Sequence, residues 1–106
     1  MSYIFMRVIV FFDLPVQTTA DRRAYAQFRK HLIRSGFIMM QESVYSKLAL
    51  HPSAAGAVMD DVRKNKPPKG LVQMLIVTEK QYARMEYVIG EPHTDIIDSD
   101  ERTIFL

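Results

Sequence analysis

The chain has 106 residues, of which 48% are hydrophobic and 25% charged, and its formal net charge is +2. This balance is typical of a single globular domain and excludes extended disorder. The sequence has no cysteine, which excludes a disulfide scaffold and a zinc site built on thiolates.

The first apolar segment, Tyr3–Phe12, predicts a central strand that is covered on both faces, because β-branched and aromatic residues run through it almost without interruption. Asp13 ends this strand. Thr18 or Thr19 is a suitable N-cap for the helix that follows. This helix is expected to stop at Gly36, a residue type that favours the position after a helix end.

Two short strands are expected next, at Phe37–Gln41 and Ser43–Leu48, since both segments are rich in bulky residues. Ser53 is the predicted N-cap of a second helix that ends near Asn65. The segment Lys64–Gly70 combines three lysines, two prolines and a glycine, and it therefore predicts a loop.

The last third of the chain begins with a buried strand at Leu71–Thr78. A helical turn is expected at Gln81–Met85 and a short extended piece at Glu86–Ile89. The polar and acidic stretch Gly90–Asp100 follows, and Thr103–Leu106 is expected to form a last strand.

The resulting order is β α β β α β, which predicts an α+β fold of the ferredoxin-like type, an antiparallel sheet with two helices on one face. We expect this domain to occupy residues 1–90 and an acidic tail with a short terminal strand to occupy residues 91–106. The other face of the sheet is left without cover by this arrangement. We therefore expect a homodimer in which two copies pack sheet to sheet.

Charge is distributed unevenly along the chain. Residues 1–90 hold 13 Lys and Arg against 7 Asp and Glu, whereas residues 91–106 hold 1 against 5. A basic body indicates a polyanionic partner, and an acidic tail indicates either docking on the body itself or a basic partner. An ordinary solvated surface is the alternative.

Basic residues gather on one side of the first helix. Arg23, Gln27, Lys30 and Arg34 follow one another at spacings of 4, 3 and 4, and Arg22 lies beside them. Surfaces that serve only solubility usually mix both signs of charge, and no acidic residue lies in this stretch. The pattern therefore favours binding to a nucleic-acid backbone over a solvated helix face.

Asp13 is a second candidate because it follows a buried strand directly. A strand end can present a carboxylate to Mg²⁺, and a two-fold dimer would bring two copies of Asp13 together. The structural alternative is a side chain that caps the turn at Leu14–Pro15. The residues alone leave these two roles open.

Other chemistry finds little support in the sequence. None of the 3 histidines has a partner at a metal-ligand spacing, and the 4 glycines form no phosphate-binding loop. The longest apolar runs, Val8–Phe12 and Leu71–Val77, are too short to span a bilayer, and no signal peptide is apparent. We expect a cytoplasmic protein with no membrane partner.

Taken together, several segments resemble the small CRISPR-associated adaptation proteins, in particular the branch found with type II-A systems. The matching segments, in chain order, are Phe11–Asp13, Arg22–Arg23, Tyr25–Ile33, Gly36–Phe37, Gln41–Tyr45, Thr78–Tyr82 and Thr103–Leu106. They extend over nearly the whole chain, and their order and spacing make the resemblance specific.

The resemblance implies a ferredoxin-like homodimer that joins two dimers of the CRISPR integrase and helps to insert foreign double-stranded DNA as new spacers. Many members are described as Mg²⁺-dependent endonucleases acting on RNA or DNA, with the strand-end aspartate, here Asp13, as the metal ligand. In this family the C-terminal strand docks at the dimer interface and the tail meets the integrase. The corresponding candidate partner contacts are Asp95, Asp98, Ile104, Phe105 and Leu106.

Two functional hypotheses follow. One is a DNA-binding, partner-bridging subunit of the spacer-acquisition complex, and the other is a metal-dependent phosphodiesterase at a paired Asp13. We favour the first because one carboxylate per chain is a small donor set for phosphodiester cleavage. A regulatory module for a small ligand is disfavoured by the basic helix.

Overall fold

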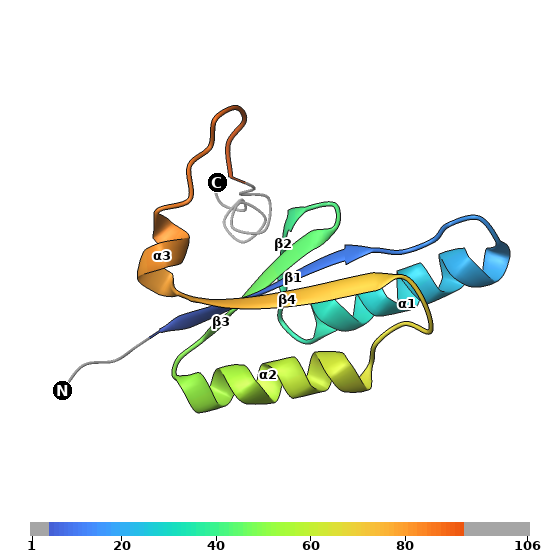
Figure 1. The fold of residues 1–106 in the computed structure, drawn as a ribbon, viewed down its shortest axis with the longest axis horizontal. Helices are drawn as coiled ribbons and strands as arrows, with labels where there is room; N and C mark the ends of the chain where they lie inside the picture. The colour runs from blue at the N-terminus through green and yellow to red at the C-terminus, as the bar shows by residue number, and fades with distance from the viewer. Residues whose placement is uncertain (1–4, 93–106) are drawn as a thin grey trace, which may run out of the picture.

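The structure, a computed structural model, describes residues 5–92 (Figure 1). In chain order the elements are β1 (Met6–Asp13), α1 (Thr19–Arg34), β2 (Ile38–Gln41), β3 (Val44–Ala49), α2 (Pro52–Lys64), β4 (Leu71–Thr78) and α3 (Glu79–Ala83). The strands form one antiparallel sheet in the order β2-β3-β1-β4, and α1 and α2 lie together on one face of it. This is the ferredoxin-like α+β arrangement that the sequence predicts.

Strand β1 occupies the centre of the sheet, between β3 and β4. Its side chains alternate, so that Val8, Val10 and Phe12 face the helices while Ile9 and Phe11 face the other way. Within residues 5–92, the two long helices cover only one face of β1, and the short helix α3 (Glu79–Ala83) contacts the other face at Arg7. The two long helices lie on one face, as the predicted fold requires, and cover of the other face by a second copy stays a prediction.

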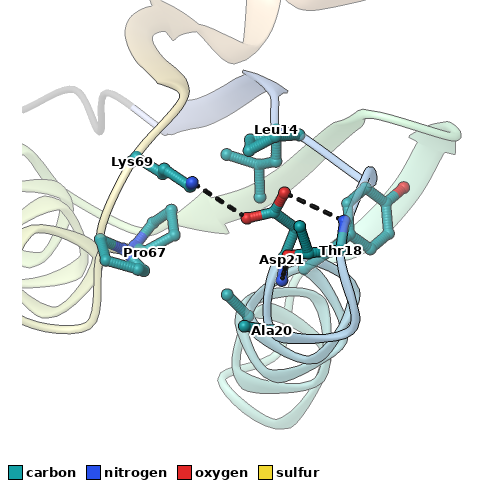
Figure 2. Close-up of a pocket in the computed structure, with 10 residues that line it drawn as sticks. Leu14, Thr18, Ala20, Asp21, Pro67 and Lys69 are labelled. Carbon is teal, nitrogen blue, oxygen red and sulfur yellow. Dashed lines mark hydrogen bonds and ion pairs between the residues drawn. The ribbon is translucent and has the colours of Figure 1, made fainter.

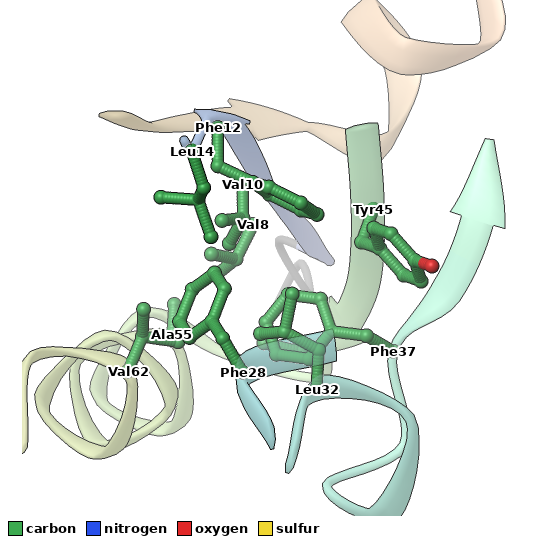
Figure 3. Packing of buried hydrophobic residues seen from close by; sticks show 11 residues of the cluster. Val8, Val10, Phe12, Leu14, Phe28, Leu32, Phe37, Tyr45, Ala55 and Val62 are labelled. Carbon is green, nitrogen blue, oxygen red and sulfur yellow. The ribbon is translucent and has the colours of Figure 1, made fainter. Parts of the chain in front are cut away.

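The core lies between the sheet and the two helices. Phe12 contacts Phe28 of α1 edge to face, with ring centroids 5.3 Å apart, and stacks on Tyr45 of β3 at 5.7 Å. Figure 3 shows Leu32 of α1 and Val62 of α2 pointing into the same cluster. Burying aromatic and branched side chains of this size contributes about 1.5–3 kcal/mol each, which fixes both helices on the sheet.

Helix α1 begins with a reciprocal capping box. The Oγ1 atom of Thr18 accepts from the Asp21 N–H at 3.0 Å, and the Asp21 carboxylate accepts from the Thr18 N–H at 3.3 Å. The helix ends where Gly36 adopts a φ of 97°, a left-handed conformation that favours glycine. Thr18 is thus the N-cap, and Gly36 follows the helix as predicted.

Helix α2 begins two residues before the expected position. His51, not Ser53, is the N-cap, and its Nδ1 atom accepts from the Ala54 N–H at 3.3 Å. Pro52 explains the difference, because proline lacks an N–H and favours the first position of a helix. The residue that precedes Pro52 must therefore cap the helix.

Helix α3 is joined to the start of β1 by a bidentate ion pair. Arg7 donates to both oxygens of Glu79, at 2.9 and 2.6 Å, and its guanidinium lies 4.2 Å from the ring centroid of Tyr82. The helix begins at Glu79 because Thr78 and Gln81 form a second capping box, two residues before the expected turn. Residues 86–89 form no strand in the described part of the chain.

No helix within residues 5–92 combines the length and the apolar character that crossing a membrane requires. The terminal strand predicted at Thr103–Leu106, and most of the acidic tail, lie outside the described residues. The division between the domain and the tail therefore stays a prediction.

Candidate functional site

Asp13 closes β1 on the face of the sheet that the helices leave open. It stands opposite Leu71 of β4 in the register, and its side chain is exposed. The carboxylate makes no hydrogen bond or ion pair with any described residue, so the turn-capping alternative is not what the structure shows. Asp13 is instead a free carboxylate on an apolar surface.

Gly70 allows the start of β4 to approach Asp13 closely. A Cβ atom at this position would lie 3.0 Å from the Asp13 carbonyl oxygen and 2.7 Å from Cδ2 of Leu14. Gly70 also has a φ of 107°, which side-chain-bearing residues rarely adopt. The close approach of this segment to Asp13 thus depends on the glycine that directly precedes β4.

Within residues 5–92, one copy of the chain offers few ligands for a magnesium ion at Asp13. The described residues contain no group of three or more His, Asp or Glu side chains that could hold a metal ion. Asp13 offers one carboxylate, and phosphodiester cleavage generally requires more protein ligands or a second metal.

The open face of the sheet is apolar. In the register, Leu48, Ile9 and Leu75 follow the same alternation as Asp13, and Ile38 of β2 joins them. Leu75 is 51% exposed and Ile38 is 42% exposed. Exposed apolar side chains gathered on one face are typical of an interaction surface.

The basic stripe on α1 comprises Arg23, Gln27, Lys30 and Arg34, which are all exposed to solvent. None of the three cations is paired with a carboxylate among the described residues. Arg22 is used differently, since its Nη1 atom donates to the carbonyl oxygens of Val16 and Gln17 at 3.1 and 3.2 Å. Arg22 therefore stabilises the loop before α1, which the sequence pattern did not indicate.

Asp21 lies beneath the beginning of the stripe and is nearly buried. Burial raises the pKa of its carboxyl group, but the hydrogen bond from the Thr18 N–H and the ion pair with Lys69 outweigh that effect and leave the pKa below its ordinary value. Figure 2 shows Lys69 reaching across to the carboxylate from the loop before β4, at 3.3 Å. Asp21 is therefore ionised and structural.

His31 links the two helices on the far side of the stripe. Its Nε2 atom lies 2.7 Å from Oδ2 of Asp61, and the Ser35 hydroxyl donates to the same carboxylate oxygen at 3.3 Å. The hydrogen bond with His31 holds the pKa of Asp61 below its ordinary value, and nearby Lys47 acts in the same direction. Sequence reasoning missed this cluster because its members come from α1, α2 and β3.

A groove runs between α1 and residues 65–69. It consists of two adjoining cavities of about 160 and 180 Å³ that share the lining residues Ala24, Pro67 and Pro68. Figure 2 shows Pro67 and Lys69 on one side of the first cavity and Ala20 on the other. The composition of Lys64–Gly70 predicts a loop, but it does not predict that this loop lies beside α1.

The remaining candidate residues cannot be placed. Asp95, Asp98, Ile104, Phe105 and Leu106 lie outside the described residues, so their assignment as partner contacts stays a prediction. The structure brings Asp13 onto the open sheet face and Arg23, Gln27, Lys30 and Arg34 onto one side of α1. These are two separate surfaces, since α1 packs on the opposite face of the sheet (Figure 1).

Comparison with known proteins gives a consistent result. Residues 6–85 match the family model described as CRISPR associated protein Cas2. Proteins named CRISPR-associated endoribonuclease Cas2 are similar over most of the chain. The one from Treponema denticola is 57% identical over 95% of this chain and 100% of its own length. The one from Streptococcus mutans serotype c, strain UA159, is 52% identical over 95% and 93%, and that from Ligilactobacillus salivarius is 44% identical over 95% and 100%.

Proposed function

Since the chain belongs to the CRISPR-associated protein Cas2 family, we propose that it acts as a dimeric subunit of the spacer-acquisition complex, which binds the backbone of duplex DNA and bridges two integrase dimers. Each part of this proposal concerns a different surface of the molecule. The basic stripe on α1 is assigned to DNA, the open sheet face to the second copy, and the acidic tail to the integrase.

The basic stripe is the observation that carries the proposal. From Arg23 to Arg34 the helix axis extends about 16 Å, which matches roughly five phosphates of one DNA strand. The cations of the stripe are exposed and unpaired with the described carboxylates, so binding to phosphate breaks no internal ion pair. Phosphate contacts of this kind position a duplex without reading its sequence.

The open sheet face supports the dimer. Leu48, Leu71 and Leu75 are 40%, 54% and 51% exposed on it. A second copy packed on this face through a two-fold axis would bury all three. The same pairing gives the complex the symmetry needed to bind one integrase dimer on each side.

The acidic tail is assigned to the integrase on grounds of charge. Residues 91–106 carry 5 acidic residues against 1 arginine, and they end in Ile104, Phe105 and Leu106. Asp95 and Asp98 suit a basic partner surface, and the three apolar residues suit an exposed sheet edge. Removal of residues 91–106 is therefore expected to weaken dimerisation, integrase binding or both.

A second candidate function is that of the endoribonuclease after which the relatives are named. The observation in its favour is the free carboxylate of Asp13 on the face assigned to the dimer. Two copies of Asp13 brought together would supply two carboxylates to a Mg²⁺ ion, which activates water and neutralises charge on a phosphodiester. RNA and DNA remain alternative substrates for this activity.

The salt dependence of DNA binding tests the proposal. If Arg23, Lys30 and Arg34 each contact one phosphate on both copies, the plot of log affinity against log salt has a slope of about −5. Replacement of all three by alanine should flatten the slope strongly and weaken binding evenly across sequences. The matched control replaces Arg63, Lys80 and Arg84, which are also exposed but lie off the stripe. An unchanged slope in the stripe variant would contradict the proposal, as would an equal loss in the control.

A further inference from the structure

The groove between α1 and residues 65–69 has two ends of different chemistry. One end contains the ion pair of Asp21 and Lys69 and is otherwise mainly apolar. The other end is lined by the polar side chains of Gln27, His31 and Lys66, together with Asn65. No carboxylate is among the described residues that line this second end. Asp21 therefore disfavours an anion at the first end, whereas Gln27 and Lys66 can donate to one at the second; His31 Nε2 and the Asn65 amide already contact Asp61.

The second end of the groove, which we call the donor-rich end, is continuous with the basic stripe. At about 3.6 residues per turn, Arg23 and Arg34 fall on one side of Gln27 around α1, and His31 falls on the other. Gln27 therefore belongs both to the stripe and to the wall of the groove. A nucleic-acid strand whose phosphates follow the stripe would therefore also pass along the groove at Gln27.

The far wall of the groove is held rigidly. Asn65 caps α2, with its side-chain amide donating to the Asp61 carbonyl oxygen at 2.9 Å. Pro67 and Pro68 have restricted φ angles, and the segment ends at Gly70, where an added Cβ atom would lie only 2.7 Å from Cδ2 of Leu14. A binding group mounted on such a segment loses little conformational entropy when a ligand arrives.

Lys66 is the available cation on this wall. Its side chain is exposed and donates only to the carbonyl oxygen of Arg63 within the described residues, at 3.3 Å. Asp61 lies behind the wall, but its carboxylate already accepts from His31 and Ser35. Lys66 can therefore turn to an anion in the groove without breaking an ion pair.

We propose that the donor-rich end of the groove binds one backbone phosphate of the nucleic acid, with Lys66 and Gln27 as its principal contacts. This inference rests on the proposed function, because the phosphate belongs to the same strand that the stripe binds. It adds a second wall to the site: the strand is bound from α1 on one side and from residues 65–66 on the other.

The test compares Lys66→Ala with Arg63→Ala in the full-length dimer. Both variants remove one exposed cation from neighbouring positions, but Arg63 pairs with Asp60 and does not line the groove. Lys66→Ala should reduce the magnitude of the salt slope by about 0.9 for each phosphate contact that is lost, and Arg63→Ala should leave it unchanged. Lys66→Arg should restore the slope.

A direct readout uses the NMR signals of the His31 ring, which lies in the wall of the groove. Duplex DNA should shift these signals in the parent protein and in Arg63→Ala, and much less in Lys66→Ala. Inorganic phosphate alone should shift them weakly, which separates the phosphate chemistry from the rest of the duplex. Far-UV circular dichroism verifies that each variant is folded.

The outcomes separate this inference from the proposed function. If the stripe variant loses DNA affinity while Lys66→Ala behaves as Arg63→Ala does and the His31 signals stay in place, the groove does not bind phosphate, although α1 binds DNA. If neither the stripe variant nor Lys66→Ala changes the salt slope, the assignment of DNA to α1 fails together with the inference.

Discussion

His31 of α1 and Asp61 of α2 lie 2.7 Å apart, from Nε2 to Oδ2, and they join two helices whose contacting residues are 30 positions apart in the sequence. Ser35 donates to the same carboxylate oxygen. The basic stripe and the groove are both carried by α1, so this link fixes the stripe relative to residues 65–69. The contact between His31 and Asp61 should therefore affect the stability of the protein, the pH dependence of that stability and the geometry of the groove.

We predict that Asp61→Asn and His31→Ala are not additive. The side chain of Asp61 is 45% exposed, so solvent screening limits the coupling to about 0.5 kcal/mol in a double-mutant cycle from urea unfolding.

The folded-state pKa of Asp61 is lowered, so its stabilising effect is fully present above the unfolded value of about 3.9 and is lost as the pH falls through the lower folded value. Parent and Asp61→Asn should therefore differ at pH 6 and converge in acid. An equal difference at both pH values would contradict this assignment.

If two copies pair through the open sheet face, as proposed, Leu75→Glu should yield a folded monomer. The side chain is 51% exposed on the open sheet face, so a carboxylate there leaves the monomer stable but is costly to bury against a second copy. Analytical ultracentrifugation measures the dissociation constant. Val16→Glu is the control, because Val16 is equally exposed at 51% but lies in the loop before α1. A Leu75→Glu protein that dimerises as tightly as this control would rule out the open face as the interface.

Asp13→Asn separates the two candidate functions. Asparagine preserves the shape of the side chain but removes the charge that a Mg²⁺ ion needs, and the basic stripe is untouched. We expect any metal-dependent cleavage to disappear while DNA binding and spacer acquisition continue near the parent level. Asp60→Asn removes a carboxylate from α2 and serves as the control. Loss of acquisition in a folded Asp13→Asn protein that still binds DNA and integrase would favour the enzyme.

Gly70→Ala should destabilise the fold by more than about 1 kcal/mol. The added Cβ would stand 2.7 Å from Cδ2 of Leu14, in a backbone conformation of φ 107° that alanine rarely adopts. Gly56→Ala is the matched control in α2, where a Cβ has nothing within 4 Å and should stabilise the helix by up to about 1 kcal/mol. Chemical denaturation measures both. Equal stabilities for the two variants would show that position 70 tolerates a Cβ atom.

Periodicity and chain order were sufficient to predict the sheet and both long helices. Strand β4 coincides with the predicted Leu71–Thr78, and α1 begins after one of the two threonines named as its N-cap. Two differences lie at helix starts, where a stronger local signal decides the cap, and the extended piece expected at Glu86–Ile89 forms no strand. Pro52 placed the cap of α2 at His51, and the T-x-x-Q pattern at Thr78 placed the start of α3.

The candidate surfaces were only partly predictable. The spacing of Arg23, Gln27, Lys30 and Arg34 indicated the stripe because helical geometry alone decides which residues share a side. The pairing of His31 with Asp61 and the approach of Lys69 to Asp21 depend on how α1, α2 and the following loop pack, which no local pattern encodes. The role of Arg22 depends on the path of the preceding loop in the same way.

The strand order β2-β3-β1-β4 has a consequence for how the protein is made. The ribosome synthesises β1 first, yet β1 pairs with β3 on one side and with β4 on the other. One edge of the central strand therefore stays unpaired until residue 78 has left the exit tunnel. During that interval Val8, Val10 and their neighbours are exposed to other nascent chains. Slow translation of residues 50–70 would lengthen this period, whereas the finished domain no longer presents β1 to other chains.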